Sequence, residues 1–183
     1  MKTALLVIDV QNDYFPGGRM ELQGSSAALD NLGRVIAKSR AEGVPVLYIQ
    51  HIAIKKEATF FIAGTSGIDI HPDIAPAPGE KVFVKHYPNS FRNTGLFEYC
   101  QQNQITSLVI TGMMTHMCVD TTTRAAFDLG FTSTLLADCC ATRNLQYLDR
   151  IVLAADVQNA YLAALDKTFA QVLTTKQYLH GEH

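Results

Sequence analysis

Long apolar runs, an excess of charge of one sign and metal-type cysteine pairs are all missing from this 183-residue sequence. The apolar runs are all far shorter than the ~20 residues that a membrane-spanning helix needs. The formal net charge of −2 gives nucleic acid or an anionic membrane no electrostatic reason to bind. The four cysteines show no C-x-x-C spacing, and two of them, Cys139 and Cys140, are adjacent. We therefore expect free thiols in a reducing cytoplasm, with neither membrane nor nucleic acid as a partner.

A secretion signal, internal repeats and a Pro/Gly-rich linker are missing as well. Lys2 is the only charged residue before the strand-like segment 3–10, and no small-residue cleavage site follows it, so we expect no signal peptide. The composition is 48% hydrophobic and 17% charged, which is typical of a well-packed globular protein. These features predict one domain that covers residues 1–183.

Short apolar runs alternate along the chain with longer segments of helical periodicity. Because strands that alternate with helices form parallel sheets, the pattern predicts an α/β fold. We expect a single-domain, doubly wound (Rossmann-like) sheet of about six parallel strands with helices on both faces. Serines 25 or 26 and residues 93 or 94 are candidate helix caps, and Gly43 is expected to end the first helix. The strands are expected at 4–8, 46–49, 81–84, 108–111, 132–137 and 170–173, and the helices at 25–42, 93–102, 119–129 and 148–165.

One segment, residues 52–80, interrupts this alternation because it is rich in glycine and proline. Loops of this length in a compact domain are usually functional or form contacts between subunits. We expect the segment to pass over the active-site edge, with the Phe60–Phe61 pair as a lid or a subunit contact.

Three side chains that can take part in catalysis stand where predicted strands end. Ligands bind at this edge of a parallel sheet. Cys118 lies at a predicted helix N-terminus, where the helix dipole favours a thiolate and free N–H groups can bind an oxyanion. Asp9 can take up the thiol proton, and Lys85 can stabilise both anions. Each residue also has a structural interpretation: a buried small hydrophobe, a turn aspartate and an exposed lysine.

Four segments of the chain resemble the isochorismatase-like cysteine hydrolases, a family that includes nicotinamidases, N-carbamoylsarcosine amidohydrolases and isochorismatases. The Gly-x-x-Thr-x-x-Cys-Val element, which begins at Gly112, is the most specific of them. The segments keep the family's order and are LVIDVQNDYF (6–15), VKHYPNSF (84–91), LVITGMMTHMCV (108–119) and LAD (136–138) with Ala141-Thr142.

The resemblance implies a role for each of these residues. Asp9 would be the general base, Lys85 its charge partner and Cys118 the nucleophile. A cis peptide bond would join Met113 to Met114 and direct the N–H groups of Met114 and Cys118 at the oxyanion. The family is usually dimeric or larger, so we expect a homodimer or homotetramer. The substrate pocket beside these residues is expected to include Gln11, Tyr14, Phe15, His51, Tyr87 and Phe91.

The sequence departs from the metal-dependent nicotinamidases of that family. Those enzymes carry an Asp-x-His pair after the second strand, whereas His51 and Ala53 stand at these positions here. His71 matches the further histidine that they use as a ligand, but scattered histidines do not make a metal site. We therefore expect no metal and no cofactor.

The predicted function is cysteine-dependent hydrolysis of an amide, carbamoyl or related C–N bond in a small molecule, through a thioester. The alternatives within the fold are vinyl-ether hydrolysis of the isochorismatase type and metal-dependent nicotinamide hydrolysis. A receiver-type signalling module is disfavoured because Lys85 stands where such modules carry a phosphorylatable aspartate. A dinucleotide-binding domain is disfavoured because Asp9-Val10-Gln11-Asn12 replaces G-x-G-x-x-G. A protein that only binds or acts as a scaffold stays an open alternative.

Overall fold

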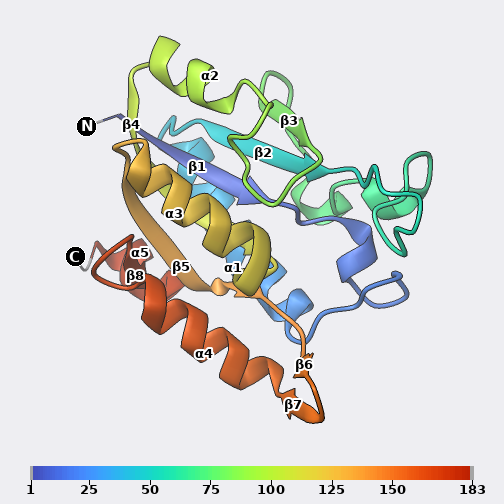
Figure 1. Cartoon of the computed structure of the whole chain (residues 1–183). Helices are drawn as coiled ribbons and strands as arrows, with labels where there is room; N and C mark the ends of the chain where they lie inside the picture. The colour runs from blue at the N-terminus through green and yellow to red at the C-terminus, as the bar shows by residue number, and fades with distance from the viewer. Residues whose placement is uncertain (1, 182–183) are drawn as a thin grey trace.

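Six parallel strands form the main sheet, in the order β3-β2-β1-β4-β5-β8, in a computed structural model that describes residues 2–181 (Figure 1). The strands of this sheet are β1 (Lys2–Ile8), β2 (Val46–His51), β3 (Lys81–Lys85), β4 (Ile105–Met113), β5 (Thr132–Ala141) and β8 (Gln171–Leu173). The α-helices are α1 (Ser25–Ala41), α2 (Leu96–Gln102), α3 (Asp120–Asp128), α4 (Ala154–Leu165) and α5 (Thr175–His180). A separate antiparallel hairpin consists of β6 (Leu145–Tyr147) and β7 (Arg150–Val152).

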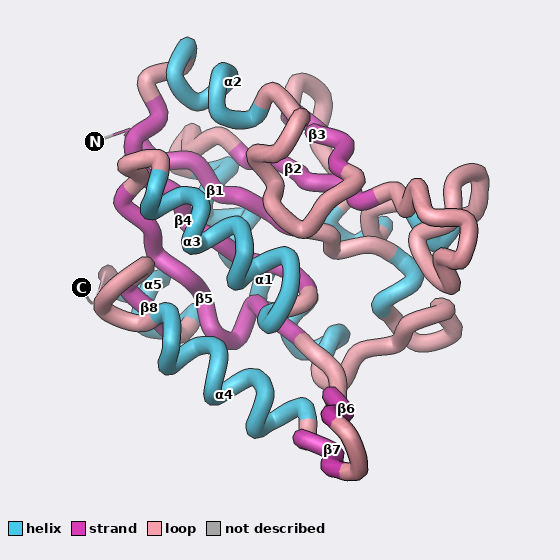
Figure 2. Tube along the Cα trace, viewed as in Figure 1, coloured by secondary structure: helices cyan, strands magenta, loops and turns pink. Residues whose placement is uncertain are grey.

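Helices cover both faces of the sheet, so the expected doubly wound α/β fold is confirmed. Figures 1 and 2 show α2, α3 and α4 in front of the sheet and α1 behind it. The side chains of β1 alternate between two buried clusters: Leu5 and Val7 face α1, whereas Leu6 and Ile8 face the other layer. Burial on both faces explains why this strand is a continuous apolar run.

The order of strands reverses between β1 and β4, which are neighbours in the sheet although they lie far apart in the sequence. At such a switch point the connections leave in opposite directions and open a crevice at the carboxyl ends of the strands. Asp9 follows β1 directly, and Cys118 follows β4 after a short turn. The fold therefore brings these two residues to one place.

The structure corrects the sequence analysis at several element boundaries. Residues 148–153 do not begin the predicted helix 148–165, because Leu148 (φ 54°) turns the β6–β7 hairpin and α4 begins only at Ala154. Neither predicted serine caps α1, since Gly24 (φ 76°) is its N-cap residue. Gly95 likewise begins α2, although the Thr94 hydroxyl accepts a hydrogen bond from the Leu96 N–H at 3.2 Å. Among residues 2–181 no helix is long and apolar enough to cross a bilayer.

The segment 52–80 is anchored to the loop that follows β1. The carboxylate of Asp13 accepts a hydrogen bond from the Phe61 N–H at 2.6 Å, and the Gln11 side chain donates to the Ile68 carbonyl at 2.8 Å. Gly67 packs so closely on Asp13 that a Cβ atom there would lie 2.3 Å from its Oδ1. Phe61 is buried, and its ring packs against Tyr14 and near His51 at the end of β2, so it belongs to the core and is not a free lid.

Candidate active site

The turn that carries Cys118 depends on one glycine at the end of β4. Gly112 has φ +120°, and a Cβ atom there would lie 2.0 Å from the carbonyl oxygen of Ile8. Only glycine allows β4 to pass this close to the end of β1. The peptide bond between Met113 and Met114 is cis, as the resemblance implies. A π-helical turn over Thr115–Val119 follows and holds Cys118 next to Asp9.

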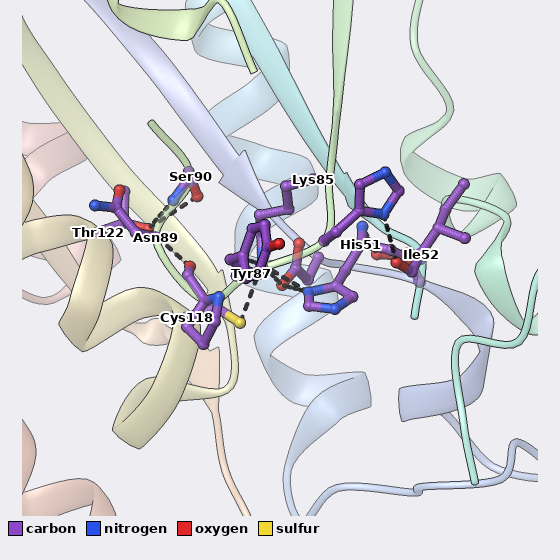
Figure 3. A network of polar contacts seen from close by, with 12 residues as sticks. His51, Ile52, Lys85, Tyr87, Asn89, Ser90, Cys118 and Thr122 are labelled. Atoms are coloured by element: carbon purple, nitrogen blue, oxygen red, sulfur yellow. Dashed lines mark hydrogen bonds and ion pairs between the residues drawn. The ribbon is translucent and has the colours of Figure 1, made fainter. Parts of the chain in front are cut away.

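Lys85 joins the predicted triad through its ammonium group (Figure 3). Its Nζ atom lies 2.7 Å from Asp9 Oδ2 and 3.1 Å from Cys118 Sγ, and it also contacts His51 Nδ1 at 2.9 Å and the Tyr87 carbonyl at 3.2 Å. Burial lowers the pKa of Lys85, but the carboxylate of Asp9, together with the Cys118 sulfur to which the ammonium donates, outweighs burial and leaves the pKa above its ordinary value. The lysine is therefore a buried permanent cation, and not the exposed side chain of the alternative interpretation.

Asp9 is fully buried, and its carboxylate can still accept hydrogen bonds. Its φ of 53° lies in the left-handed region, which aspartate tolerates better than most residues. Apart from the ion pair with Lys85, its carboxylate oxygens have no hydrogen-bond partner within residues 2–181. A buried polar atom without a hydrogen-bond partner calls for an explanation, and a catalytic role is one.

The thiol of Cys118 does not have the lowered pKa that a helix N-terminus predicts. Burial raises the pKa of Cys118 and the carboxylate of Asp9 raises it further, whereas the ammonium of Lys85 lowers it without restoring the ordinary value. These surroundings favour the thiol, and not the thiolate that a helix dipole alone would favour. The cause of the difference is the enclosure of the sulfur, which is buried beside the carboxylate of Asp9.

His51 contacts the triad because of the strand register, and the sequence analysis missed this contact. Residues 51 and 85 are direct partners in the parallel pairing of β2 with β3, so their side chains lie on the same side of the sheet. An ammonium group can only donate, so Nδ1 of His51 must accept its hydrogen bond. Burial lowers the pKa of His51 to about 4, which keeps the ring neutral.

Two of the other expected pocket residues lie close to the triad. The ring of Tyr14 is buried against Phe61, with 4.6 Å between the ring centroids, and its pKa is raised by burial and then by the nearby charges of Cys118 and Asp9. Gln11 is fully buried, and its amide bonds the backbone of His51 in both directions, at 2.7 and 2.9 Å. Gln11 therefore positions β2 at the site.

The side chains of the remaining expected pocket residues pack against residues outside the triad. Phe15 lies against the ring of His71 at 4.3 Å and lines a cavity of about 370 Å³ between the loop after β1 and the segment 52–80. Tyr87 reaches Lys85 only through its carbonyl, and its ring lies 3.7 Å from the guanidinium carbon of Arg92. Phe91 stacks on Phe131, which precedes β5 at the opposite end of the sheet. The structure thus does not place Phe91 beside Cys118.

Comparison with known proteins agrees with this geometry. The sequence profile of the isochorismatase domain matches residues 3–177. The chain belongs to the isochorismatase family. This isochorismatase-family chain is 45% identical to YddQ, an uncharacterized family protein of Bacillus subtilis, over 98% of this chain and 99% of YddQ. A crystal structure from Oleispira antarctica, named for an isochorismatase hydrolase, matches with a TM-score of 0.94 and 42% identity over 98% of this chain and 97% of that one.

Amidohydrolases occur among the more distant relatives of this isochorismatase-family chain. RutB of Methylobacterium radiotolerans, a ureidoacrylate amidohydrolase, is 28% identical over 83% of this chain and 72% of RutB. Family membership together with such relatives supports assignment of the chain as a hydrolase.

Three possible metal ligands meet in this isochorismatase-family site. One ligand atom each from Asp9, His51 and Cys118 lies within 4.8 Å of the other two. The ammonium of Lys85 contacts all three of these side chains, so the space between them already holds a cation. His71 is turned to the Asp73 N–H at 3.4 Å and belongs to a different contact. The donor set therefore fits a metal ion only if Lys85 is displaced.

Hydroxyl groups hold the turns of the isochorismatase-family site, and among them is Thr115 of the Gly-x-x-Thr-x-x-Cys-Val element. The Thr122 hydroxyl of α3 bonds the Ser90 hydroxyl at 2.8 Å and its N–H at 3.1 Å, which fixes the loop after β3. Thr115 donates to Gln158 of α4 at 2.6 Å and so ties the π-helical turn to that helix. Serine and threonine are too common for their spacing alone to reveal such contacts.

Proposed function

We propose that this chain hydrolyses an amide, carbamoyl or related C–N bond of a small molecule through a thioester on Cys118. The observation that carries the proposal is the single ammonium group of Lys85 in contact with both Asp9 and Cys118. A nucleophile, a base and a fixed positive charge in one buried site are the apparatus of covalent acyl transfer.

The first step starts from the thiol, because burial and Asp9 disfavour a resting thiolate. The free oxygen of Asp9 takes the thiol proton while the sulfur attacks the carbonyl carbon of the substrate. A C–S bond forms, and the electron pair of the C=O double bond moves to oxygen. Lys85 stabilises the negative charge on sulfur during this transfer and keeps the carboxylate in place.

The oxyanion would form against the N–H groups of Met114 and Cys118. Cys118 is the fourth residue of the π-helical turn, within the first turn, where N–H groups lack acceptors inside the helix. The Met114 carbonyl closes this turn with the N–H groups of Met117 and Val119, at 3.0 and 3.2 Å, and leaves the N–H of Cys118 out of these bonds. Donors fixed in advance stabilise a developing oxyanion.

The second half of the cycle regenerates the thiol. The C–N bond breaks, and the leaving amine takes the proton held by Asp9. Asp9 then removes a proton from water, which attacks the thioester and releases the acid, and the sulfur recovers its proton. The overall reaction consumes one water and yields an amine and a carboxylic or carbamic acid.

Several observations support a small substrate with a C–N bond over the alternatives. Asp9 and Lys85 are each at most 1% exposed, and such an enclosed site favours a small substrate over a large one. RutB is named for the hydrolysis of a ureido compound, which contains a carbonyl between two nitrogens. Vinyl-ether hydrolysis does not need the nucleophile that Cys118 offers. The metal-dependent nicotinamidases use an Asp-x-His pair for which this chain has His51 and Ala53. All four cysteines are free, which supports the proposal of a reducing cytoplasm.

The proposal is tested by a screen of amides, ureido and carbamoyl compounds with the wild type and the Cys118→Ala variant. We expect turnover of a confirmed substrate to fall at least ~10³-fold without loss of stability, because removal of a nucleophile leaves only binding and the oxyanion donors. The buried Cys100→Ala variant serves as the control and should keep its activity. Mass spectrometry after acid quench should show the acyl group on Cys118. A fully active Cys118→Ala protein would refute the proposal.

A further inference from the structure

His116 is a buried histidine with one ring nitrogen that has no partner. The residue is 7% exposed and lies in the π-helical turn, two positions before Cys118. Its Nδ1 atom lies 2.5 Å from the Thr142 hydroxyl oxygen, whereas its Nε2 atom is buried without a hydrogen bond to any group of residues 2–181. The ring of Tyr161 in α4 stands edge-on to the imidazole, with 6.0 Å between the ring centroids. The imidazole is therefore hydrogen-bonded on one side only.

The unpartnered nitrogen argues against a role for His116 as a simple core residue. An unpartnered buried polar atom destabilises the folded state, and an apolar side chain could fill the same space without one. Burial lowers the pKa of His116 and the charge of Arg143 lowers it further, so the ring is neutral at pH 7. Local arrangements that cost stability concentrate at functional sites. The bond at Nδ1 is the contact that such a function would use.

His116 lies between the two proposed oxyanion donors. Met114 precedes the π-helical turn and Cys118 lies within it, so the conformation of residues 115–116 sets how the two N–H groups face a substrate carbonyl. A misplacement of about 1 Å in an active site can cost ~10²-fold in rate. A contact that fixes the backbone at His116 therefore acts on the oxyanion without touching the substrate.

Thr142 is suited to hold the turn because it is itself fixed. It follows β5 directly, is 2% exposed and forms an isolated antiparallel bridge with Gln23, in the loop before α1. The preceding residue, Ala141, is paired with Met113 of β4. The Thr142 hydroxyl thus belongs to the rigid end of the sheet, and a site held by rigid elements keeps its geometry.

We propose that His116 is a positioning residue whose Nδ1–Thr142 hydrogen bond aims the two oxyanion donors. The inference rests on the proposed thioester chemistry, because the donors act only when a carbonyl is attacked. It gives Nε2 no part, so a side chain that replaces only Nδ1 should suffice. The contact stabilises the transition state and not the bound substrate, so its loss should lower kcat on a confirmed substrate and leave KM unchanged.

The test compares two reactions of the Cys118 sulfur. Acylation by p-nitrophenyl acetate passes through an oxyanion: a C–S bond forms, the ester C–O bond breaks, p-nitrophenolate leaves, and the thiol proton passes to Asp9 and on to water. Alkylation by iodoacetamide displaces iodide from the same sulfur and forms no oxyanion. The ratio of the two rates, with each label located by peptide mapping, therefore reports on the donors separately from the thiol.

Four variants separate the two ring nitrogens. Asparagine and glutamine both carry an amide that donates and accepts, placed near the position of Nδ1 in asparagine and of Nε2 in glutamine. We expect His116→Gln, His116→Leu and Thr142→Val to be acylated ~10–100-fold more slowly and alkylated at the wild-type rate. His116→Asn should keep most of the wild-type acylation rate. Ser133→Ala removes another buried unpartnered polar atom, near the start of β5, and as the matched control should change neither rate.

Thermal unfolding separates positioning from a purely structural role. The His116→Leu/Thr142→Val double variant removes the hydrogen bond and the unpartnered nitrogen together, so it should be at least as stable as the wild type and yet be acylated slowly. The proposal is overturned if His116→Asn is as slow as His116→Leu, if alkylation falls together with acylation, or if wild-type Cys118 is not acylated. The expected contrast in a protein that hydrolyses no C–N substrate would support this role of His116 and refute only the proposed substrate class.

Discussion

His51 accepts a hydrogen bond from the ammonium of Lys85 at 2.9 Å, with the two residues paired directly across β2 and β3. The contact needs a neutral imidazole whose Nδ1 carries no proton, and burial secures this by lowering the pKa of His51 to about 4. A protonated His51 would instead place two positive charges in contact. The histidine thus holds the lysine in position without adding charge to the site.

The stability of the protein should fall in acid because of His51. The unfolded chain binds a proton at this residue near pH 6.5, its ordinary pKa, whereas the folded protein does so only near pH 4. Below pH 6.5 the unfolded state therefore binds more protons, and the free energy of unfolding decreases by up to about 3 kcal/mol by pH 4. Urea unfolding at several pH values should show a smaller decrease in the His51→Asn variant, which keeps an acceptor that does not titrate. Equal decreases in both proteins would contradict this explanation.

Alkylation of Cys118 should respond in opposite directions to the loss of its two charged neighbours. Asp9 raises the pKa of the thiol and Lys85 lowers it. Asp9→Asn should therefore speed iodoacetamide labelling at neutral pH, and Lys85→Met should slow it, by about tenfold for each unit of pKa change. In the wild type the rate should increase with pH through the neutral range. Peptide mapping separates Cys118 from Cys100 as an internal control, and the reverse order of the two variants would refute the assigned contacts.

Removal of the lysine should create a zinc site. In Lys85→Ala the side chains of Asp9, His51 and Cys118 keep a carboxylate, an imidazole and a thiol around an emptied position, which is a set that Zn²⁺ binds well. Zinc at 100 times its Kd would stabilise the variant by about 2.7 kcal/mol. Thermal unfolding with and without Zn²⁺ measures the effect, and the wild type and Lys85→Ala/His51→Leu serve as controls. The prediction fails if Lys85→Ala gains no stability from zinc.

Gly112→Ala should damage both the fold and the site. The new methyl group would overlap the Ile8 carbonyl at 2.0 Å and push β1, together with Asp9, away from the turn of Cys118. We expect a loss of roughly 3 kcal/mol in the free energy of unfolding, together with loss of turnover. Gly33→Ala is the matched control: it lies inside α1 with nothing within 4 Å of the new Cβ, so it should stabilise by about 0.5–1 kcal/mol. A Gly112→Ala protein as stable as the wild type would show that β4 can shift at no cost.

The sequence predicted the strands well because burial on both faces leaves a direct trace in their composition. The run Ala4–Ile8 is apolar throughout, and all of its residues are buried. The N-termini of the helices were predicted less well. Gly24 and Gly95 are the N-cap residues of α1 and α2, whereas neighbouring polar residues were predicted as the caps. Residues 148–153 were predicted as the start of a helix, because their apolar side chains carry no sign of whether they face a core or solvent.

The sequence by itself determined the chemical types available at the site: a carboxylate, an amine and a thiol, each at the end of a strand. Only the tertiary structure decided which residues these groups contact and whether they carry a proton. The register of β2 with β3 set His51 beside Lys85, and the enclosure of Cys118 beside Asp9 raised its pKa where a helix terminus alone predicts the opposite. Register and burial arise from contacts between residues distant in sequence, and the protonation of a group depends on the surroundings those contacts create.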